Sequence, residues 1–482
     1  MIEEKEIDKT EVNLHAFYSK TSFNFFILFV SLTLTFIHNF LKSNYFIGTW
    51  NILAYLLILA PLAWMFIKKE LNNRYTKWFI PTIFILITDI FVYSNDFTQY
   101  FLPYIVYLLI FVLYMTSMQN VSSLYQTLIP RKAIPIQPIK NIITLTGSLL
   151  LYKEHKNIYN RIALALIITL PVAGLFLLLF MSADSNFKGF VTEIFKLKLK
   201  FGSLDLFWIA FYMIFFINFF LFSFSNKKDR KVFQTDKSFD PLIIGIFLGM
   251  LNLLFIMFLI FQINYLFGGE SYVKESAINI AQFAREGFFQ LMWVMGSVFI
   301  IFLFIMSRYH GEKNTAFLLS GLILSTMIIG FASLKKMHLY QSLKGATVLR
   351  YYVEWFDYFL LLILGLGIIF ILKRIPYFKL LNVIVVFGLL SLTIVSSMNV
   401  DKMVASHNIN KFGAMNNKLD KTAISQLSID IWPVIKGTDM NFTSSTYNSY
   451  IYNRDCSKFS EYHYGYCQLI NKYPEAKMKI IH

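Results

Sequence analysis

The sequence is poor in charge and in cysteine, and it lacks the motifs of several common enzyme classes. Of its 482 residues only 15% are charged, and two are cysteines. It has no glycine-rich phosphate loop ending in Lys-Ser or Lys-Thr, no paired-cysteine metal motif, no His-Glu-x-x-His and no Gly-x-Ser-x-Gly. These absences argue against an ATP-driven pump or a zinc hydrolase. We therefore expect no cofactor and no metal, and an enzyme is the less favoured class.

Apolar residues are abundant. They make up 56% of the chain, with 18% aromatic residues, and they fall in repeated runs near membrane-spanning length. The net charge of +16 is therefore not interpreted as affinity for nucleic acid. In a membrane protein, excess Lys and Arg lie in cytoplasmic loops and against anionic headgroups. The expected partner is membrane lipid.

These runs predict an all-α polytopic bundle of eleven spans, at roughly residues 22–41, 48–67, 77–94, 100–118, 161–182, 204–226, 241–267, 287–307, 315–334, 354–372 and 376–398. Only helices satisfy their own backbone hydrogen bonds across lipid in runs of this length. Connections on one side carry about twice as many Lys and Arg as those on the other. The bias predicts a cytoplasmic N-terminus and an extracytoplasmic C-terminus. The first 20 residues are polar, so no removable signal peptide is expected.

The chain divides by composition into five parts. We expect a cytoplasmic tail at 1–21, a four-span bundle at 22–118, a cytoplasmic loop at 119–160, a seven-span core at 161–398 and a small extracytoplasmic α+β domain at 399–482. In the last part, Asp420 is placed to cap a helix, and residues 441–452 are rich in strand-forming side chains.

The densest polar cluster beside a span lies between residues 268 and 306. Glu270–Glu286 reads as an amphipathic helix, which Gly268 and Gly269 separate from the preceding span. Gly287 then lets the chain bend into the next span. Arg285 and Glu286 lie either at the mouth of a cavity between helices or simply among headgroups.

Three stretches resemble a known family. The runs AQFAREGFFQL (281–291), LFLLLFMSADSNF (175–187), and SHNINKF (406–412) with LSIDIWPVI (427–435) are similar to the signatures of a bacterial membrane family, the related domains of unknown function four-one-five-three and four-one-seven-three. The resemblance covers about residues 171–436. The resemblance implies many membrane spans and a soluble C-terminal piece. It indicates where the protein is located but assigns no chemical mechanism, because the family's motifs have no established chemistry.

Ionisable residues within or beside the spans are candidate binding residues, because charge in lipid is costly. Asp89 is either a coupling carboxylate or the partner of a polar group on a neighbouring helix. Glu354 and Asp357 are one turn apart, and Arg350 precedes Glu354 by four residues, which also suits a plain ion pair. Asp184 either caps a following helix or binds a cation.

Shared topology places most of these residues on the outer side. The sharpest hypothesis is one outward-facing binding site built from Asp184, Arg285, Glu286, Arg350, Glu354 and Asp357, with Asp89 as a further candidate. His338, at the edge of a span, is interpreted as structural. No catalytic residue and no metal ligand is assigned.

Cys456 and Cys467 are either bridged or two free thiols. Along one helix they would lie about 16 Å apart, so a disulfide needs a turn between them, and residues 464–466 (Tyr-Gly-Tyr) suit one. An extracytoplasmic tail favours the bridge.

Three functions remain open. The first is a transporter or permease for a small or amphiphilic solute, using the outer site and Asp89. The second is a non-catalytic assembly or sensory protein whose C-terminal domain binds an envelope partner, and the third is a membrane enzyme acting on a lipid-linked substrate. The sequence does not indicate an oligomeric state.

Overall fold

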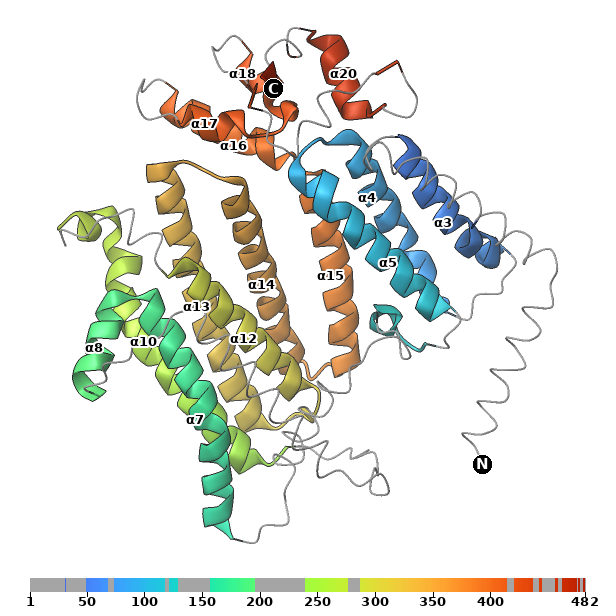
Figure 1. The fold of residues 1–482 in the computed structure, drawn as a ribbon. Coiled ribbons are helices and arrows are strands. Elements are labelled where there is room, and N and C mark those ends of the chain that lie inside the picture. The colour runs from blue at the N-terminus through green and yellow to red at the C-terminus, as the bar shows by residue number, and fades with distance from the viewer. Residues whose placement is uncertain are drawn as a thin grey trace, which may run out of the picture. The chain divides into compact units, whose positions relative to one another are not determined.

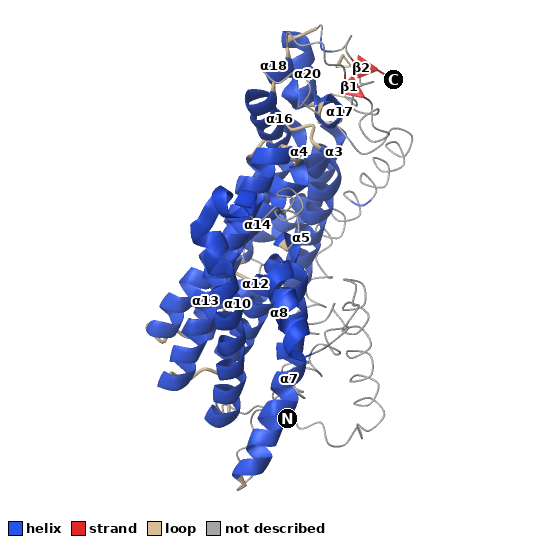
Figure 2. Ribbon diagram, turned by 90° about the vertical axis from the view of Figure 1, so that its left-hand side faces the viewer, coloured by secondary structure: helices blue, strands red, loops and turns tan. Residues whose placement is uncertain are grey.

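A computed structural model gives the fold (Figure 1). It describes residues 31, 49–67, 73–117, 121–128, 157–195, 239–275, 287–413, 420–436, 442–443, 456–457, 462–474, 476 and 480–481. Over these residues the chain is helical, apart from one short pair of strands (Figure 2). The predicted helical class is therefore confirmed.

Seven helical segments of the described chain are long and apolar enough to cross a bilayer. They are Phe97–Ser117, Ile158–Ala183, Pro241–Gln262, Phe288–Met306, Lys313–Lys344, Val348–Leu372 and Tyr377–Ser397. Apart from residue 31, the predicted spans at 22–41 and 204–226 lie outside the described residues. Helix α3 (Thr49–Ile67) has 19 residues and matches the predicted span at 48–67. Helix α4 (Ile80–Val92) has 13 residues and is shorter than the predicted span at 77–94. Since 13 residues extend only about 20 Å, α4 is short for a ~30 Å hydrocarbon core.

The compact units of the structure do not follow chain order. One comprises residues 1–133 with 385–482, and the other residues 134–384. Helix α15 (Tyr377–Ser397) crosses the boundary between the two units.

The unit of residues 134–384 is a helical bundle. It contains α7 (Ile158–Ala183), α8 (Ser185–Phe195), α10 (Pro241–Glu275), α12 (Phe288–Met306), α13 (Lys313–Lys344) and α14 (Val348–Leu372). Asn157 caps α7 by accepting from the Tyr159 backbone N–H. The Arg161 Nε donates to Asp240 Oδ2 at 2.8 Å, which ties the start of α7 to the start of α10.

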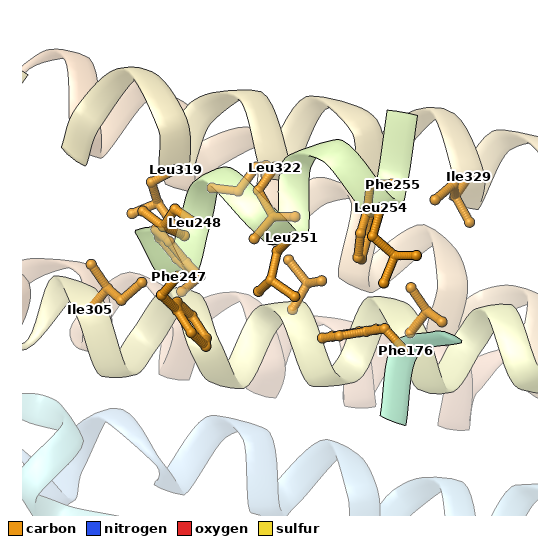
Figure 3. Packing of buried hydrophobic residues seen from close by; sticks show 14 of the residues in the cluster. Phe176, Phe247, Leu248, Leu251, Leu254, Phe255, Ile305, Leu319, Leu322 and Ile329 are labelled. Carbon is orange, nitrogen blue, oxygen red and sulfur yellow. The ribbon is translucent and has the colours of Figure 1, made fainter. Parts of the chain in front are cut away.

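Phenylalanine dominates the core of this bundle. Phe180 of α7 stacks on Phe258 of α10 with ring centroids 4.1 Å apart, and Phe176 meets Phe255 edge-on at 5.1 Å. Figure 3 shows the apolar side chains of α7, α10, α12 and α13 packed between their helices, with the labelled residues Phe176, Phe247, Leu248, Leu251, Leu254, Phe255, Ile305, Leu319, Leu322 and Ile329. Such close packing sets where the polar groups at the helix ends lie.

One expectation about this bundle is wrong. Helix α10 does not stop at Gly268 and Gly269 but runs through both to Glu275. Glycine costs a helix only about 1 kcal/mol per residue, and a helix already tens of residues long tolerates that cost. Residues 276–286, the rest of the expected amphipathic helix, lie outside the described chain.

The other unit packs α3, α4 and α5 (Leu102–Ser117) with the last part of α15 and with the C-terminal segments. A π-helical turn, Phe97–Phe101, precedes α5, and the 3-10 turns Thr76–Trp78 and Leu124–Leu128 flank the helices. The core includes Tyr55, Phe79 and Leu102, all buried.

The C-terminal region has a small core of its own. It comprises α16 (Val400–Phe412), α17 (Lys421–Ser425), a 3-10 turn (Ile429–Ile431), α18 (Trp432–Ile435), α20 (Tyr464–Lys472) and a parallel pair, β1 (Phe442–Thr443) with β2 (Ile480–Ile481). Asp420 caps α17 by accepting from the Ala423 backbone N–H. The predicted cap at Asp420 is therefore present, and the helix that it starts ends at Ser425.

Cys456 and Cys467 form a disulfide with Cα atoms 5.6 Å apart. His463 caps α20, and residues 464–466 form the first turn of that helix. The bridge therefore joins a turn at Cys456 to the middle of a helix, and the expected turn at 464–466 is wrong.

Candidate functional site

Asp184 stands where α7 ends and α8 begins. Its Oδ1 accepts hydrogen bonds from the backbone N–H groups of Asn186 and Phe187, at 2.9 and 3.0 Å, so it caps α8. Its Oδ2 accepts from the Gln262 side-chain amide of α10 at 2.9 Å. Asp184 also interacts electrostatically with Lys336 of α13, whose side chain is fully buried. One carboxylate thus links three helices.

The start of α12 lies directly against this corner. Gly287 has φ +91°, and a Cβ added there would lie under 3.0 Å from three backbone atoms of Ala183. Only glycine allows such a close approach at a positive φ. Two of the stretches that carry the family resemblance, Ser182–Phe187 and Gly287–Leu291, are therefore brought together. Arg285 and Glu286 fall outside the described residues.

A second polar group joins α13 and α14, which run side by side (Figure 1). Glu354 is bonded to His338 through its Oε1 and accepts from the Gln341 side-chain amide at 3.0 Å through its Oε2. The Ser333 hydroxyl lies 3.4 Å from Asp357 Oδ2 and is its donor. Asp357 is fully buried, and among the described residues its Oδ1 has no hydrogen-bond partner.

The expected Arg350–Glu354 pair does not form. The Arg350 guanidinium donates to the Gly345 carbonyl and lies over the Tyr340 ring, 4.2 Å from its centroid. Glu354 takes its partners from the neighbouring helix instead. Contacts across helices thus prevail over the spacing of four residues that suggested the pair.

The two polar groups share the same end of the bundle through α13. Ser333 and Lys336 are one turn apart, and His338 and Gln341 follow towards the end of the helix. At 32 residues and ~1.5 Å per residue, α13 exceeds a ~30 Å hydrocarbon core. Because its apolar run ends before Lys335, we place its C-terminal part towards the rim of the membrane. We name the set Asp184, Gln262, Ser333, Lys336, His338, Gln341, Glu354 and Asp357 the rim site.

Several members of the rim site were not assigned from the sequence. Lys336 lies just outside the predicted span at 315–334, and the sequence favours a structural role for His338. Lys335 and Lys336 follow a long apolar run, and a lysine inside an extended α13 is the signal that the sequence offers. Gln262 and Gln341 carry no signal of their own. The described residues contain no group of three or more His, Cys, Asp or Glu suited to a metal ion.

Asp89 belongs to the other unit and is not part of the rim site. Its Oδ2 accepts from the hydroxyls of Ser396 at 2.6 Å and Ser397 at 2.9 Å, at the end of α15. It is buried, with 6% of its surface exposed. The sequence left Asp89 as either a coupling carboxylate or the partner of a polar group on a neighbouring helix. In the structure it is paired with the two serines of α15.

The C-terminal segments pack on the end of α4. The Ser94 backbone N–H donates to Asp430 Oδ2 at 2.8 Å, and the buried His463 ring lies 3.3 Å from the Gln99 side chain. A Cβ on Gly465 would lie under 3.0 Å from the Val92 carbonyl group. Burial and the nearby Asp401 carboxylate raise the pKa of Asp430 to about 7, against the hydrogen bonds from Ser94.

The long apolar helices, with charged groups buried at one end of a bundle, define a multi-pass helical membrane protein. The chain matches the family model described as Domain of unknown function (DUF4153) over residues 24–437 and belongs to that family. The match extends well before residue 171, where the sequence resemblance weakened. No curated protein and no solved structure matches the chain.

Proposed function

We propose that the protein is a membrane carrier for a small or amphiphilic solute, with the rim site as its binding site. The observation that carries the proposal is the fully buried Lys336 beside Asp184, in a bundle that also buries Asp357. Buried charges are costly, and a bundle held only for stability would be served as well by apolar residues. Ligand sites in helical bundles are built from inward-facing side chains of several helices. The rim site draws on α7, α10, α13 and α14.

The charges of the rim site suit a solute that carries both polar and apolar parts. Lys336 offers a cation, Asp357 a carboxylate, and the phenylalanines of α7 and α10 lie next to Asp184 and Gln262. A bound solute would exchange its water shell for these groups and for the surrounding aromatic side chains.

Uptake by proteoliposomes tests the proposal. Purified full-length protein would be given a labelled amino-acid mixture, a monosaccharide, a nucleoside and a short-chain fatty acid in turn. We expect protein-dependent accumulation of at least one probe, its loss in Lys336→Met, and its retention in Glu193→Gln, which changes an exposed carboxylate of α8. Accumulation no greater than in empty liposomes for every probe would overturn the proposal.

We also propose the finer topology: eleven spans, the N-terminus in the cytoplasm, and the α+β C-terminal domain outside the inner membrane. The charge bias of the loops supports it, as does the disulfide, which persists outside the cytoplasm. A membrane-impermeant maleimide applied to intact cells provides the test. Labelling of Cys456 and Cys467 only after reduction is expected, whereas labelling only in broken cells would invert the topology.

The C-terminal domain supports a second candidate function, binding of an envelope partner. It has its own small core and a disulfide, and it packs on the membrane helix α4. A photo-crosslinking residue in place of the exposed Tyr464 would be expected to capture one envelope protein reproducibly. The same residue in place of Lys421, which is exposed on α17, would serve as the positional comparison. Equal and diffuse labelling from both positions would argue against this role.

A further inference from the structure

Three titratable side chains of the rim site form a series from exposed to buried. The His338 side chain is 55% exposed and is bonded through Nε2 to Glu354, whose side chain is 11% exposed. Asp357 follows Glu354 by three residues on α14 and is fully buried. Residues three apart on a helix are neighbours. The series therefore leads from the surface of the bundle to its interior.

The two carboxyl groups also influence each other. Glu354 and Asp357 interact electrostatically, and two nearby buried carboxylates strongly disfavour carrying two charges at once. The Asp357 Oδ1 has no hydrogen-bond partner among the described residues, while Oδ2 has the Ser333 hydroxyl. A proton on Asp357 would remove the charge that this environment disfavours.

The other charged groups around the series are already engaged. Lys336 of α13 interacts with Asp184, and Arg350 of α14 is held by the Gly345 carbonyl and the Tyr340 ring. Tyr351 and Tyr358, also on α14, lie beside Glu354. Helix α12 and the residues 241–262 of α10 carry no titratable side chain. Of the two described titratable groups that hydrogen-bond to Glu354, His338 and Tyr358, only His338 can bring a proton in as a cation.

We propose that His338, Glu354 and Asp357 form a proton path, and that the proton is the coupling ion of the carrier. The imidazolium Nε2–H gives its proton to Glu354, the Glu354 acid passes it to the Asp357 carboxylate, and the neutral His338 regains a proton from solvent. Histidine suits the entry because it changes charge near neutral pH. Buried carboxyl groups suit the inner end because membrane proton relays use such residues. This inference rests on the proposed carrier function.

Infrared difference spectroscopy of the full-length protein in liposomes tests the path without any cargo. The carbonyl stretch of a protonated carboxylic acid would be followed while pH is changed at constant sodium. Every variant would also carry Asp430→Asn, because Asp430 is a second carboxyl group with a pKa of about 7. We expect a titrating acid band that corresponds to about one proton per protein, absent in Asp357→Asn and unchanged in Glu193→Gln. His338→Gln should keep the band but slow its appearance after a pH jump by about 10²-fold.

Two results would overturn the inference. One is an acid band that persists in Asp357→Asn, and the other is a band that responds to sodium at constant pH, which would indicate a cation in place of the proton. If Asp357→Asn does not fold, the test rests on His338→Gln, which changes the exposed end of the path. An acid band that appears after the pH jump as fast in His338→Gln as in wild type would reject the path. Probe uptake without a titrating band rejects the path alone, and a titrating band without uptake rejects the carrier alone.

Discussion

Replacing Gly287 by alanine tests the corner where α7, α8 and α12 meet. An L-residue at a positive φ costs about 1–2 kcal/mol. The new Cβ would also lie under 3.0 Å from backbone atoms of Ala183, and relieving such overlap typically costs a further ~1–3 kcal/mol. The two terms sum to roughly 2–5 kcal/mol. Ala183 cannot retreat easily, because its neighbour Asp184 is fixed by the α8 cap and by Gln262.

The matched control is Gly296→Ala, inside the same helix, where an added Cβ meets nothing within 4 Å. Alanine there should stabilise α12 by about 0.5–1 kcal/mol, since it reduces the freedom of the unfolded chain. Unfolding temperatures would be measured on the full-length protein in detergent by size exclusion after heating. We expect Gly287→Ala to unfold on the order of 10 °C below wild type and Gly296→Ala at or above it. Equal temperatures for the two variants would refute the close contact between Gly287 and Ala183.

Three further predictions concern the C-terminal domain. Burial and Asp401 raise the pKa of Asp430 to about 7, above its value of ~3.9 in the unfolded chain. The folded protein therefore holds a proton on Asp430 more tightly, and this stabilises it fully below pH ~4 but no longer once the pH has risen through about 7. Asp430→Asn should flatten this pH dependence of the unfolding temperature. Cys456→Ser should cost the domain about 3 kcal/mol through loop closure, measured by proteolysis. Gly465→Ala should detach α20 from the Val92 carbonyl and speed cleavage of the domain.

Each of these has an internal comparison. Reductant should destabilise wild type but leave Cys456→Ser unchanged, and an equal effect on both would show that the bridge contributes nothing. Gln468→Ala changes an exposed residue of α20 and should be cleaved at the wild-type rate. Faster cleavage of Gln468→Ala than of Gly465→Ala would contradict the tight packing at Gly465. For Asp430, the wild-type protein should lose stability between pH 4 and 7 relative to Asp430→Asn. A wild-type stability that rises over this range would contradict the prediction.

The sequence by itself determined the features that depend on neighbouring residues along the chain. Apolar runs predicted the membrane class and placed the long helices, because a span needs only length and hydropathy. The caps at Asp184 and Asp420 were equally local, since a side chain reaches the N–H groups two or three residues on. The exception is instructive: Gly268 and Gly269 looked like a break, but a helix supported by its packed part continued through them.

Only the tertiary structure decided which distant side chains meet. It paired His338 with Glu354 in place of Arg350, and it set Lys336 beside Asp184. It also bridged Cys456 to Cys467 while residues 464–466, where the spacing alone suggested a turn, are part of a helix. The physical reason is that helix packing is fixed by the fit of many apolar side chains, such as the phenylalanines of α7 and α10. The polar groups at the helix ends then meet wherever that packing brings them.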